Sequence, residues 1–149
     1  MSLDRHRIPF LSILILLVVL PAVDWVQAAP KPQQLNTVEV VRGTLTSIPG
    51  KGPALKTTSR EYVLAGQSSY LLHTLEDKRL LSHELQLVGT AGPDGTFTVQ
   101  KLYDVHNGKL YHVQYYCEVC NITYVQPGHC YCCGRETKLR EVPVSQANP

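Results

Sequence analysis

Apolar and polar positions alternate along most of the chain after residue 36, and stretches rich in glycine and proline interrupt the alternation. Alternation with a period of two is typical of strands that bury one face. The strands predicted from this pattern span residues 37–47, 60–66, 68–74, 83–90, 96–105 and 110–117. The chain is therefore expected to be mainly β.

The interruptions predict the connections between these strands. Residues 48–59 contain two prolines and two glycines and are expected to form a loop, and residues 91–95, "AGPDG", a turn. Asn107–Gly108 is the preferred pair for a type I′ hairpin turn. In "LEDKRLLS", residues 75–82, side chains spaced four apart predict a short helix.

Three strands, a short helix and two further strands predict a small OB-like five-stranded barrel over residues 37–106. The first strand changes the phase of its alternation between Val40 and Val41, just before Gly43, which predicts a bulge or strong bend. An antiparallel sandwich of the same strands is the alternative. Residues 107–141 are expected to form a hairpin and a zinc-ribbon-like knuckle module, and residues 142–149 a flexible tail.

The first 28 residues have the layout of a secretory signal peptide. Arg5 and Arg7 precede an apolar run, Ile8–Val23, and Val26 and Ala28 place small side chains at the expected cleavage site. We therefore expect an exported protein, periplasmic or extracellular, whose residues 29–36, "APKPQQLN", form a flexible tether. An uncleaved N-terminal membrane anchor is the alternative.

The charge of the chain argues against nucleic acid as a partner. The formal net charge is +2, and removal of residues 1–28 takes away two arginines and two aspartates, so it stays +2. A zinc ion held by four thiolates contributes −2 and brings the total near zero. Such a chain has no strong field for nucleic acid or anionic lipid. The expected partner is an envelope protein or a saccharide, with membrane contact only through an uncleaved signal segment.

All five cysteines fall between residues 117 and 133. Four of them form two pairs with Cys-x-x-Cys spacing, at which a tight turn can aim both sulfurs at one ion. Zinc takes four ligands tetrahedrally, so two such turns complete its coordination. The expected ligands of a bound Zn²⁺ are Cys117, Cys120, Cys130 and Cys133.

The residues after each pair fit such turns, because Gly134 and Asn121 both tolerate a positive φ angle. Cys132 is expected to be a spare thiol, and it, His129 and His112 are the alternative ligands. The nine-residue gap between the pairs, 121–129, is shorter than the roughly 15–20 residues of common zinc ribbons, so the connecting hairpin must be short.

Disulfide bonds are the main alternative to a metal, because an exported chain meets an oxidising compartment. Five cysteines cannot all pair within one chain, so full oxidation leaves one free thiol or an intermolecular bridge. A thioredoxin-like enzyme is not expected, because neither pair follows a βαβ pattern.

The segment "YYCEVCNITYVQPGHCYCCGRETKL" resembles the heavy-metal-binding, zinc-ribbon-like segment of bacterial exported metal-handling proteins. The matching residues are Tyr115, Cys117, Cys120, Pro127, Gly128, Cys130, Cys133, Gly134 and Leu139. Cys120 stands where many members have His, and Arg135 stands where many have Met, so the resemblance implies zinc rather than copper. The preceding part looks like exported bacterial OB-fold domains of unassigned role.

No catalytic constellation is evident in the sequence. His73, His83 and Glu84 lack a positioned nucleophile and are expected to be ordinary surface polar residues, and the tyrosines around the cysteines are expected to cover the module. The sequence thus predicts an exported, non-enzymatic zinc-binding protein with a β-barrel binding domain. A copper or zinc carrier or sensor is one alternative, and a disulfide-stabilised envelope binding module is the other.

Overall fold

The computed structural model describes residues 37–146, which belong to one compact unit, Gln34–Pro149. The expected signal peptide and tether, residues 1–36, lie outside the described residues. Within residues 37–146, no helix is long and apolar enough to cross a membrane.

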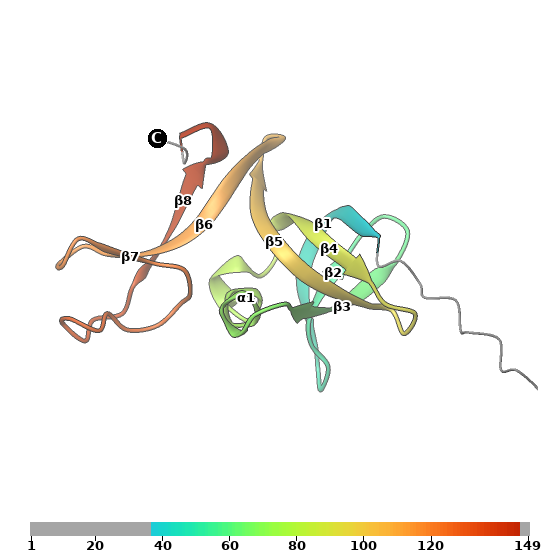
Figure 1. The fold of residues 1–149 in the computed structure, drawn as a ribbon, viewed down its shortest axis with the longest axis horizontal. Helices are drawn as coiled ribbons and strands as arrows, with labels where there is room; N and C mark the ends of the chain where they lie inside the picture. Colours follow the sequence, from blue (N-terminus) through green and yellow to red (C-terminus); the bar gives the residue numbers. More distant parts are fainter. Residues whose placement is uncertain (1–36, 147–149) are drawn as a thin grey trace, which may run out of the picture. The chain divides into compact units, whose positions relative to one another are not determined.

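The described chain is mainly β, as the alternation predicts, with one short α-helix (Figure 1). The strands are β1 (Val38–Ile48), β2 (Gly52–Lys56), β3 (Glu61–Gly66), β4 (Glu84–Ala91), β5 (Thr96–His106), β6 (Lys109–Cys117), β7 (Ile122–Tyr124) and β8 (Lys138–Pro143). The helix α1 spans Ser69–Leu75, and the 3₁₀ turns η1 and η2 span Lys78–Leu80 and Val144–Gln146.

The first five strands pair in a closed circuit. β1 lies between β2 and β4 with antiparallel pairing, β2 pairs with β3, and β4 pairs with β5. A parallel pairing between β3 and β5 returns the circuit to its start. β6 leaves β5 at the Asn107–Gly108 turn, whose φ angles of 50° and 76° confirm the predicted type I′ geometry. β6 then pairs with β7 and β8 (Figure 1).

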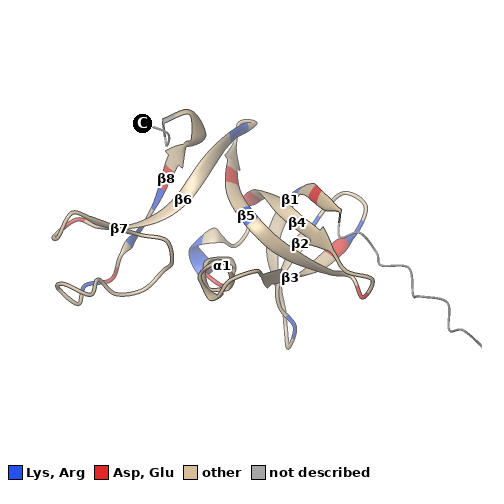
Figure 2. Cartoon of the chain, viewed as in Figure 1, with Lys and Arg blue, Asp and Glu red and all other residues tan. Residues whose placement is uncertain are grey.

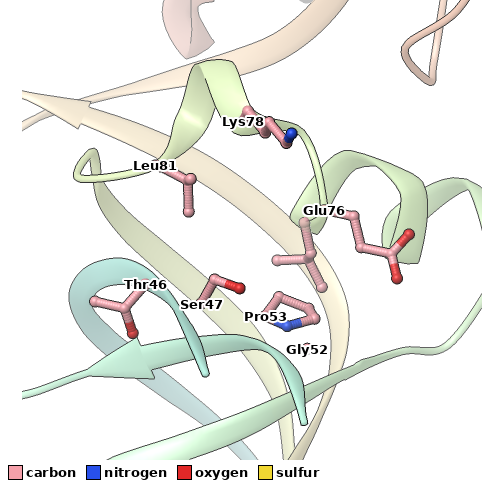
Figure 3. Close-up of a pocket in the computed structure, with 8 residues that line it drawn as sticks. Thr46, Ser47, Gly52, Pro53, Glu76, Lys78 and Leu81 are labelled. Atoms are coloured by element: carbon pink, nitrogen blue, oxygen red, sulfur yellow. The ribbon is translucent and has the colours of Figure 1, made fainter. Parts of the chain in front are cut away.

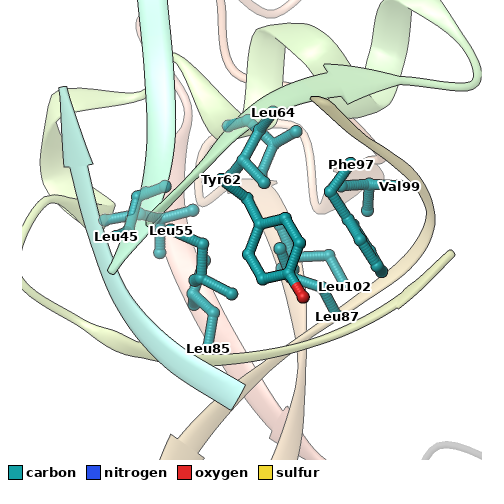
Figure 4. Close-up of a cluster of buried hydrophobic side chains, with 11 residues drawn as sticks. Leu45, Leu55, Tyr62, Leu64, Leu85, Leu87, Phe97, Val99 and Leu102 are labelled. Carbon is teal, nitrogen blue, oxygen red and sulfur yellow. The ribbon is translucent and has the colours of Figure 1, made fainter. Parts of the chain in front are cut away.

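Apolar side chains, mostly leucines, from the five strands of the closed circuit, from α1 and from η1 form the core (Figure 4). The buried cluster is Leu45, Leu55, Tyr62, Leu64, Leu75, Leu80, Leu85, Leu87, Phe97, Val99 and Leu102. β4 supplies its members with the predicted alternation, Leu85 and Leu87, and β5 supplies Phe97 and Val99 in the same way. Val113 of β6 and Leu139 of β8 pack against this cluster, so the C-terminal strands share the core.

The predicted loop over residues 48–59 is wrong, because β2 lies inside it. Pro53, Ala54 and Leu55 are all buried, so this strand is covered on both faces and has no alternation to reveal it. The turn before it is tight, and Gly50 and Gly52 adopt φ angles of 76° and 90°.

The predicted third strand, residues 68–74, is also wrong, because α1 occupies it. The Ser68 side chain accepts a hydrogen bond from the backbone N–H of Leu71 and caps the helix, and Leu75 is buried in the core. The helix expected at 75–82 is reduced to the 3₁₀ turn η1, capped by Asp77. Within residues 37–106 the predicted number of strands, five, matches the structure only because one missed strand offsets one helix taken for a strand.

The bulge expected in the first strand is not found there. β1 keeps a continuous register with both partners, and Gly43 lies where β1 passes from β4 to β2. A Cβ atom on Gly43 would lie 2.4 Å from the Lys56 carbonyl oxygen, so close backbone approach explains this glycine. A register shift occurs instead between Val88 and Gly89 of β4.

The expected tail also needs correction. β8 continues through Val142 to Pro143, paired with β6, and η2 follows it. Residues on both sides of the boundary expected between 106 and 107 belong to the unit Gln34–Pro149.

Candidate metal centre

The first cysteine pair lies in a tight turn at the end of β6. The backbone N–H of Asn121 donates to the Cys117 carbonyl over 2.8 Å, and Asn121 has a φ of 57°. The backbone N–H groups of Cys120 and Val119 point at the Cys117 sulfur. This turn directs the sulfurs of Cys117 and Cys120 to the same side.

The second pair repeats this geometry residue for residue. The backbone N–H of Gly134 donates to the Cys130 carbonyl over 2.8 Å, and Gly134 has a φ of 70°. The backbone N–H groups of Cys133 and Cys132 point at the Cys130 sulfur. The left-handed conformations predicted for Asn121 and Gly134 are therefore confirmed.

The two turns bring together the four cysteines that the spacing singles out. The sulfurs of Cys117, Cys120, Cys130 and Cys133 all lie within 4.8 Å of one another, and those of Cys117 and Cys133 are 3.5 Å apart. Tetrahedral zinc with Zn–S bonds of ~2.3 Å requires S–S separations of about 3.8 Å. All five cysteines are free thiols in this structure. The spacing therefore suits four ligands around one ion.

The thiols differ in their readiness to lose a proton. The Tyr124 hydroxyl, 3.3 Å away, and the backbone N–H groups of Cys133 and Cys132 lower the pKa of Cys130 to about 6. The neighbouring Cys132 and Cys133 thiols raise the pKa of Cys120. The Cys130 thiolate thus forms readily, and a cation bound beside it would favour loss of the Cys120 proton.

The segment that carries the site, residues 117–137, has almost no apolar interior. Its buried side chains are Cys117, Cys130 and Thr137. Thr137 closes the second turn, because its hydroxyl donates to the Gly128 carbonyl over 2.8 Å. Val119 and Val125 are exposed. The sulfur cluster is therefore the centre of this segment.

Arg79 of η1 joins the cysteine segment to the core. Its guanidinium donates to the Thr137 carbonyl over 2.8 Å, forms a 2.8 Å ion pair with Asp77, and lies 5.2 Å from the centre of the Tyr115 ring. Tyr115 is fully buried. A second contact joins the His73 ring to the Gln126 side chain, 3.1 Å apart.

The alternative ligands lie outside the sulfur cluster. Cys132 is exposed, and its thiol contacts that of Cys120 without joining the group of four. His129 is exposed and pairs with Glu136 through its backbone. His112 stacks at a tilt on Tyr103, 5.3 Å between ring centres.

Tyrosines surround the cysteine segment, as expected for a cover. Tyr124 meets Tyr131 edge to face at 5.7 Å, and the Tyr116 hydroxyl bonds the Asn121 side chain. Arg140 lies over the Tyr116 ring. Acidic and basic residues both occur along the strands β1–β5 and along the C-terminal strands (Figure 2).

One hollow lies in the core region, away from the cysteines. It lies between the β1–β2 turn and the α1–η1 connection, with Thr46, Ser47 and Pro53 on one side and Glu76, Lys78 and Leu81 on the other (Figure 3). Its lining contains no thiol and no imidazole. It offers one carboxylate and one ammonium group and no arrangement that suggests a metal or a reaction.

The sequence reasoning missed a second cluster of metal-ligating side chains. Donor atoms of His83, Asp104, His106 and Glu141 all lie within 4.8 Å of one another. His83, expected to be an ordinary surface residue, is only partly exposed and lies 2.7 Å from the Asp104 carboxylate. No local spacing could have revealed this group, because its members come from three separate segments.

Comparison of the chain with known protein families, with curated proteins and with solved structures finds no match.

Proposed function

We propose that this chain is an exported, non-enzymatic zinc-binding protein whose four-cysteine site stabilises a small module beside an OB-type barrel. The observation that carries the proposal is the pair of equivalent turns, each aiming two sulfurs at one centre. Tetrahedral four-thiolate sites are typical of structural zinc. Closed coordination leaves no position for a substrate, so the ion supplies folding free energy rather than chemistry.

The exposed character of residues 117–137 supports this structural role. Short segments without an apolar core need a crosslink or a metal to stay folded. The segment buries three side chains, and two of these are cysteines of the cluster. A bound zinc ion would stabilise this segment in the way that buried leucines stabilise the closed circuit.

Strand pairing supports an OB-type barrel as the companion domain. The circuit β1-β2-β3-β5-β4, with the helix α1 between β3 and β4, is that expected of a five-stranded OB barrel. Such barrels bind ligands on the strand face and adjoining loops. The chain has mixed charge and an apolar N-terminal run that is typical of export signals. We therefore propose that the barrel binds an envelope protein or a saccharide.

Native mass spectrometry of the chain, purified from its export compartment without reductant, tests the proposal. We expect five reduced cysteines and bound zinc. The variant Cys120→Ser should carry one zinc ion fewer than the wild type. The matched control Cys132→Ser, which alters a cysteine outside the cluster, should lose none. A chain lighter by two or four hydrogens, with no zinc lost in Cys120→Ser, would make this a disulfide-stabilised protein.

Metal transfer is a second candidate function, and the position of Cys132 favours it. Cys133 is exposed, and the Cys132 thiol contacts Cys120 at the edge of the cluster. A spare thiol beside a ligand can capture an ion as it leaves. If the protein is a zinc or copper carrier, a competing chelator should remove the ion within minutes, and Cys132→Ser should slow the removal. A structural site should release its ion over hours at a rate independent of Cys132.

A further inference from the structure

The second cluster joins three segments that are distant in the sequence. His83 directly precedes β4, Asp104 and His106 lie two residues apart on one face of β5, and Glu141 lies on β8. β8 belongs to the C-terminal strands, and β4 and β5 belong to the closed circuit. The four side chains therefore meet where these two parts of the chain contact each other.

Each imidazole faces both carboxylates. His83 Nδ1 lies 2.7 Å from Asp104 Oδ2 and 3.8 Å from Glu141 Oε1. His106 Nε2 lies 2.7 Å from Glu141 Oε2 and 3.4 Å from Asp104 Oδ2. The donor atoms thus converge on a common centre and do not form two separate pairs.

The His106 nitrogen is not satisfied by these neighbours. Nε2 is buried and makes no hydrogen bond, although Glu141 Oε2 is only 2.7 Å away. Two atoms that bind one ion point at that ion and not at each other, which would account for a short separation without a hydrogen bond. A buried ring nitrogen without a hydrogen bond is uncommon and calls for a partner.

The two carboxylates also call for a cation. Asp104 is fully buried, and its second oxygen accepts the backbone N–H of Val105 over 2.7 Å. Glu141 lies partly buried beside Asp104. Neighbouring carboxylates repel each other unless a positive charge lies between them.

The backbone around the cluster holds its members in place. Ser82 adopts a φ of 68°, uncommon for a residue other than glycine, and its N–H donates to the Leu45 carbonyl. The N–H and carbonyl of His83 are bonded to Leu80 and Leu45, over 3.0 and 2.9 Å. The other three residues lie on paired strands, and the His106 ring packs edge-on against Tyr111 at 5.1 Å. A site built on such rigid elements is largely preformed.

We propose that His83, Asp104, His106 and Glu141 form a second metal site, which binds Zn²⁺ and ties β8 to β4 and β5. Two imidazoles and two carboxylates suit a divalent transition metal, and the imidazoles disfavour Ca²⁺ and Mg²⁺. Solvent reaches the site, because the side chains of His106 and Glu141 are 40% and 27% exposed. This site shares no residue with the four-cysteine cluster and does not depend on the function proposed for it.

Titration of the metal-free, reduced full chain with Co²⁺ tests the second site. Cobalt bound by thiolates gives strong charge-transfer absorption, and cobalt bound by nitrogen and oxygen does not. We expect two equivalents to bind, one with charge-transfer bands and one without. Isothermal titration with Zn²⁺ should likewise give two equivalents. Glu141→Gln and His106→Gln should weaken only the equivalent without charge-transfer bands, by at least about tenfold.

Two control variants distinguish failure of this proposal from failure of the proposed four-cysteine zinc site. Glu39→Gln changes an exposed carboxylate on β1 and should leave both equivalents unchanged. Cys120→Ser should weaken the equivalent with charge-transfer bands and spare the other. The proposal is overturned if the wild type binds no equivalent of the second kind. It is equally overturned if that equivalent survives unchanged in Glu141→Gln and His106→Gln, provided that circular dichroism shows both variants folded.

Discussion

The closed circuit of β1–β5 and the cysteine segment of residues 117–137 reach a stable fold by different means. Every strand of the circuit buries at least one leucine, and β3 and β5 also bury the rings of Tyr62 and Phe97. The segment buries only two cysteines and one threonine. Apolar burial contributes free energy in proportion to area, and a short segment has too little area to use it. The segment thus lacks the apolar core that stabilises the circuit, and under our proposal a metal ion at the four cysteines replaces it.

Loss of one sulfur ligand should have the largest effect on this contrast. Cys130→Ser removes a buried ligand, and we expect it to abolish tight zinc binding at the cluster and to unfold residues 117–137 at neutral pH. The exposed Cys132→Ser should retain both the zinc and the fold. Zinc content and proteolysis within the segment provide the measurements. Equal sensitivity of the two variants to protease would contradict the assignment of ligands.

A cavity in the leucine core should have the opposite effect: it should destabilise the circuit and leave zinc binding intact. Phe97 is fully buried and meets Tyr62 edge to face at 5.4 Å. Phe97→Ala should lower the free energy of unfolding by about 3–5 kcal/mol while the cysteine site keeps its zinc below the melting temperature. Urea denaturation with metal analysis measures both. Loss of zinc from the folded variant would show that the two regions are not separable.

Removal of Asp77 should weaken the connection between the two regions in a pH-dependent way. Burial raises the pKa of Asp77, but hydrogen bonds from the Arg79 side chain and backbone outweigh it, so the pKa lies below its usual value of 3.8. A carboxylate with a lowered folded-state pKa stabilises the fold above its unfolded-state pKa, and that stabilisation is lost as the pH falls through the folded-state value.

Asp77→Ala should therefore cost about 1–3 kcal/mol at pH 7, and the deficit relative to the wild type should shrink below about pH 4. Urea denaturation of both proteins across this range measures the deficit. The exposed Asp94→Ala is the matched control and should leave the attachment of residues 117–137 to the core unaltered. A deficit for Asp77→Ala that is the same at pH 7 and pH 3 would contradict the role of its charge.

The smallest expected effect concerns the turns themselves. Gly134 has a φ of 70°, so Gly134→Ala should destabilise the loaded module by about 1 kcal/mol. Asn121→Gly, at the equivalent position of the first turn, relieves the positive φ but loses the hydrogen bond from the Tyr116 hydroxyl, so the two effects should nearly cancel. Chelator competition with each variant measures the change in zinc affinity. A larger loss for Asn121→Gly than for Gly134→Ala would contradict the equivalence of the two turns.

The sequence predicts those strands and turns whose signals lie in residues close together along the chain. Leu85 and Leu87 alternate because one face of β4 is buried, and Asn107–Gly108 turns the last hairpin because both residues tolerate a positive φ. The two cysteine turns were predicted in the same way, from spacing and from the residue after each pair. β2 was missed because it is buried on both faces, and α1 was missed although Ser68 provides a helix cap.

The cluster of His83, Asp104, His106 and Glu141 shows what a single sequence cannot supply. Asp104 and His106 are two apart on a strand, which is an ordinary spacing for polar residues at the end of a hairpin. Their meeting with Glu141 depends on the pairing of β6 with both β5 and β8, and their meeting with His83 depends on the pairing of β4 with β5. Contacts of such long range appear only once the chain is folded.

Amide hydrogen exchange tests most directly whether zinc holds the segment while the leucine core holds the circuit. Cys120→Ser and Cys132→Ser should be compared, both with zinc present. We predict that residues 117–137 lose protection in Cys120→Ser alone, while the amides of β1–β5 exchange as slowly as in Cys132→Ser. Loss of protection throughout the chain in Cys120→Ser, or unchanged protection of residues 117–137, would contradict the account.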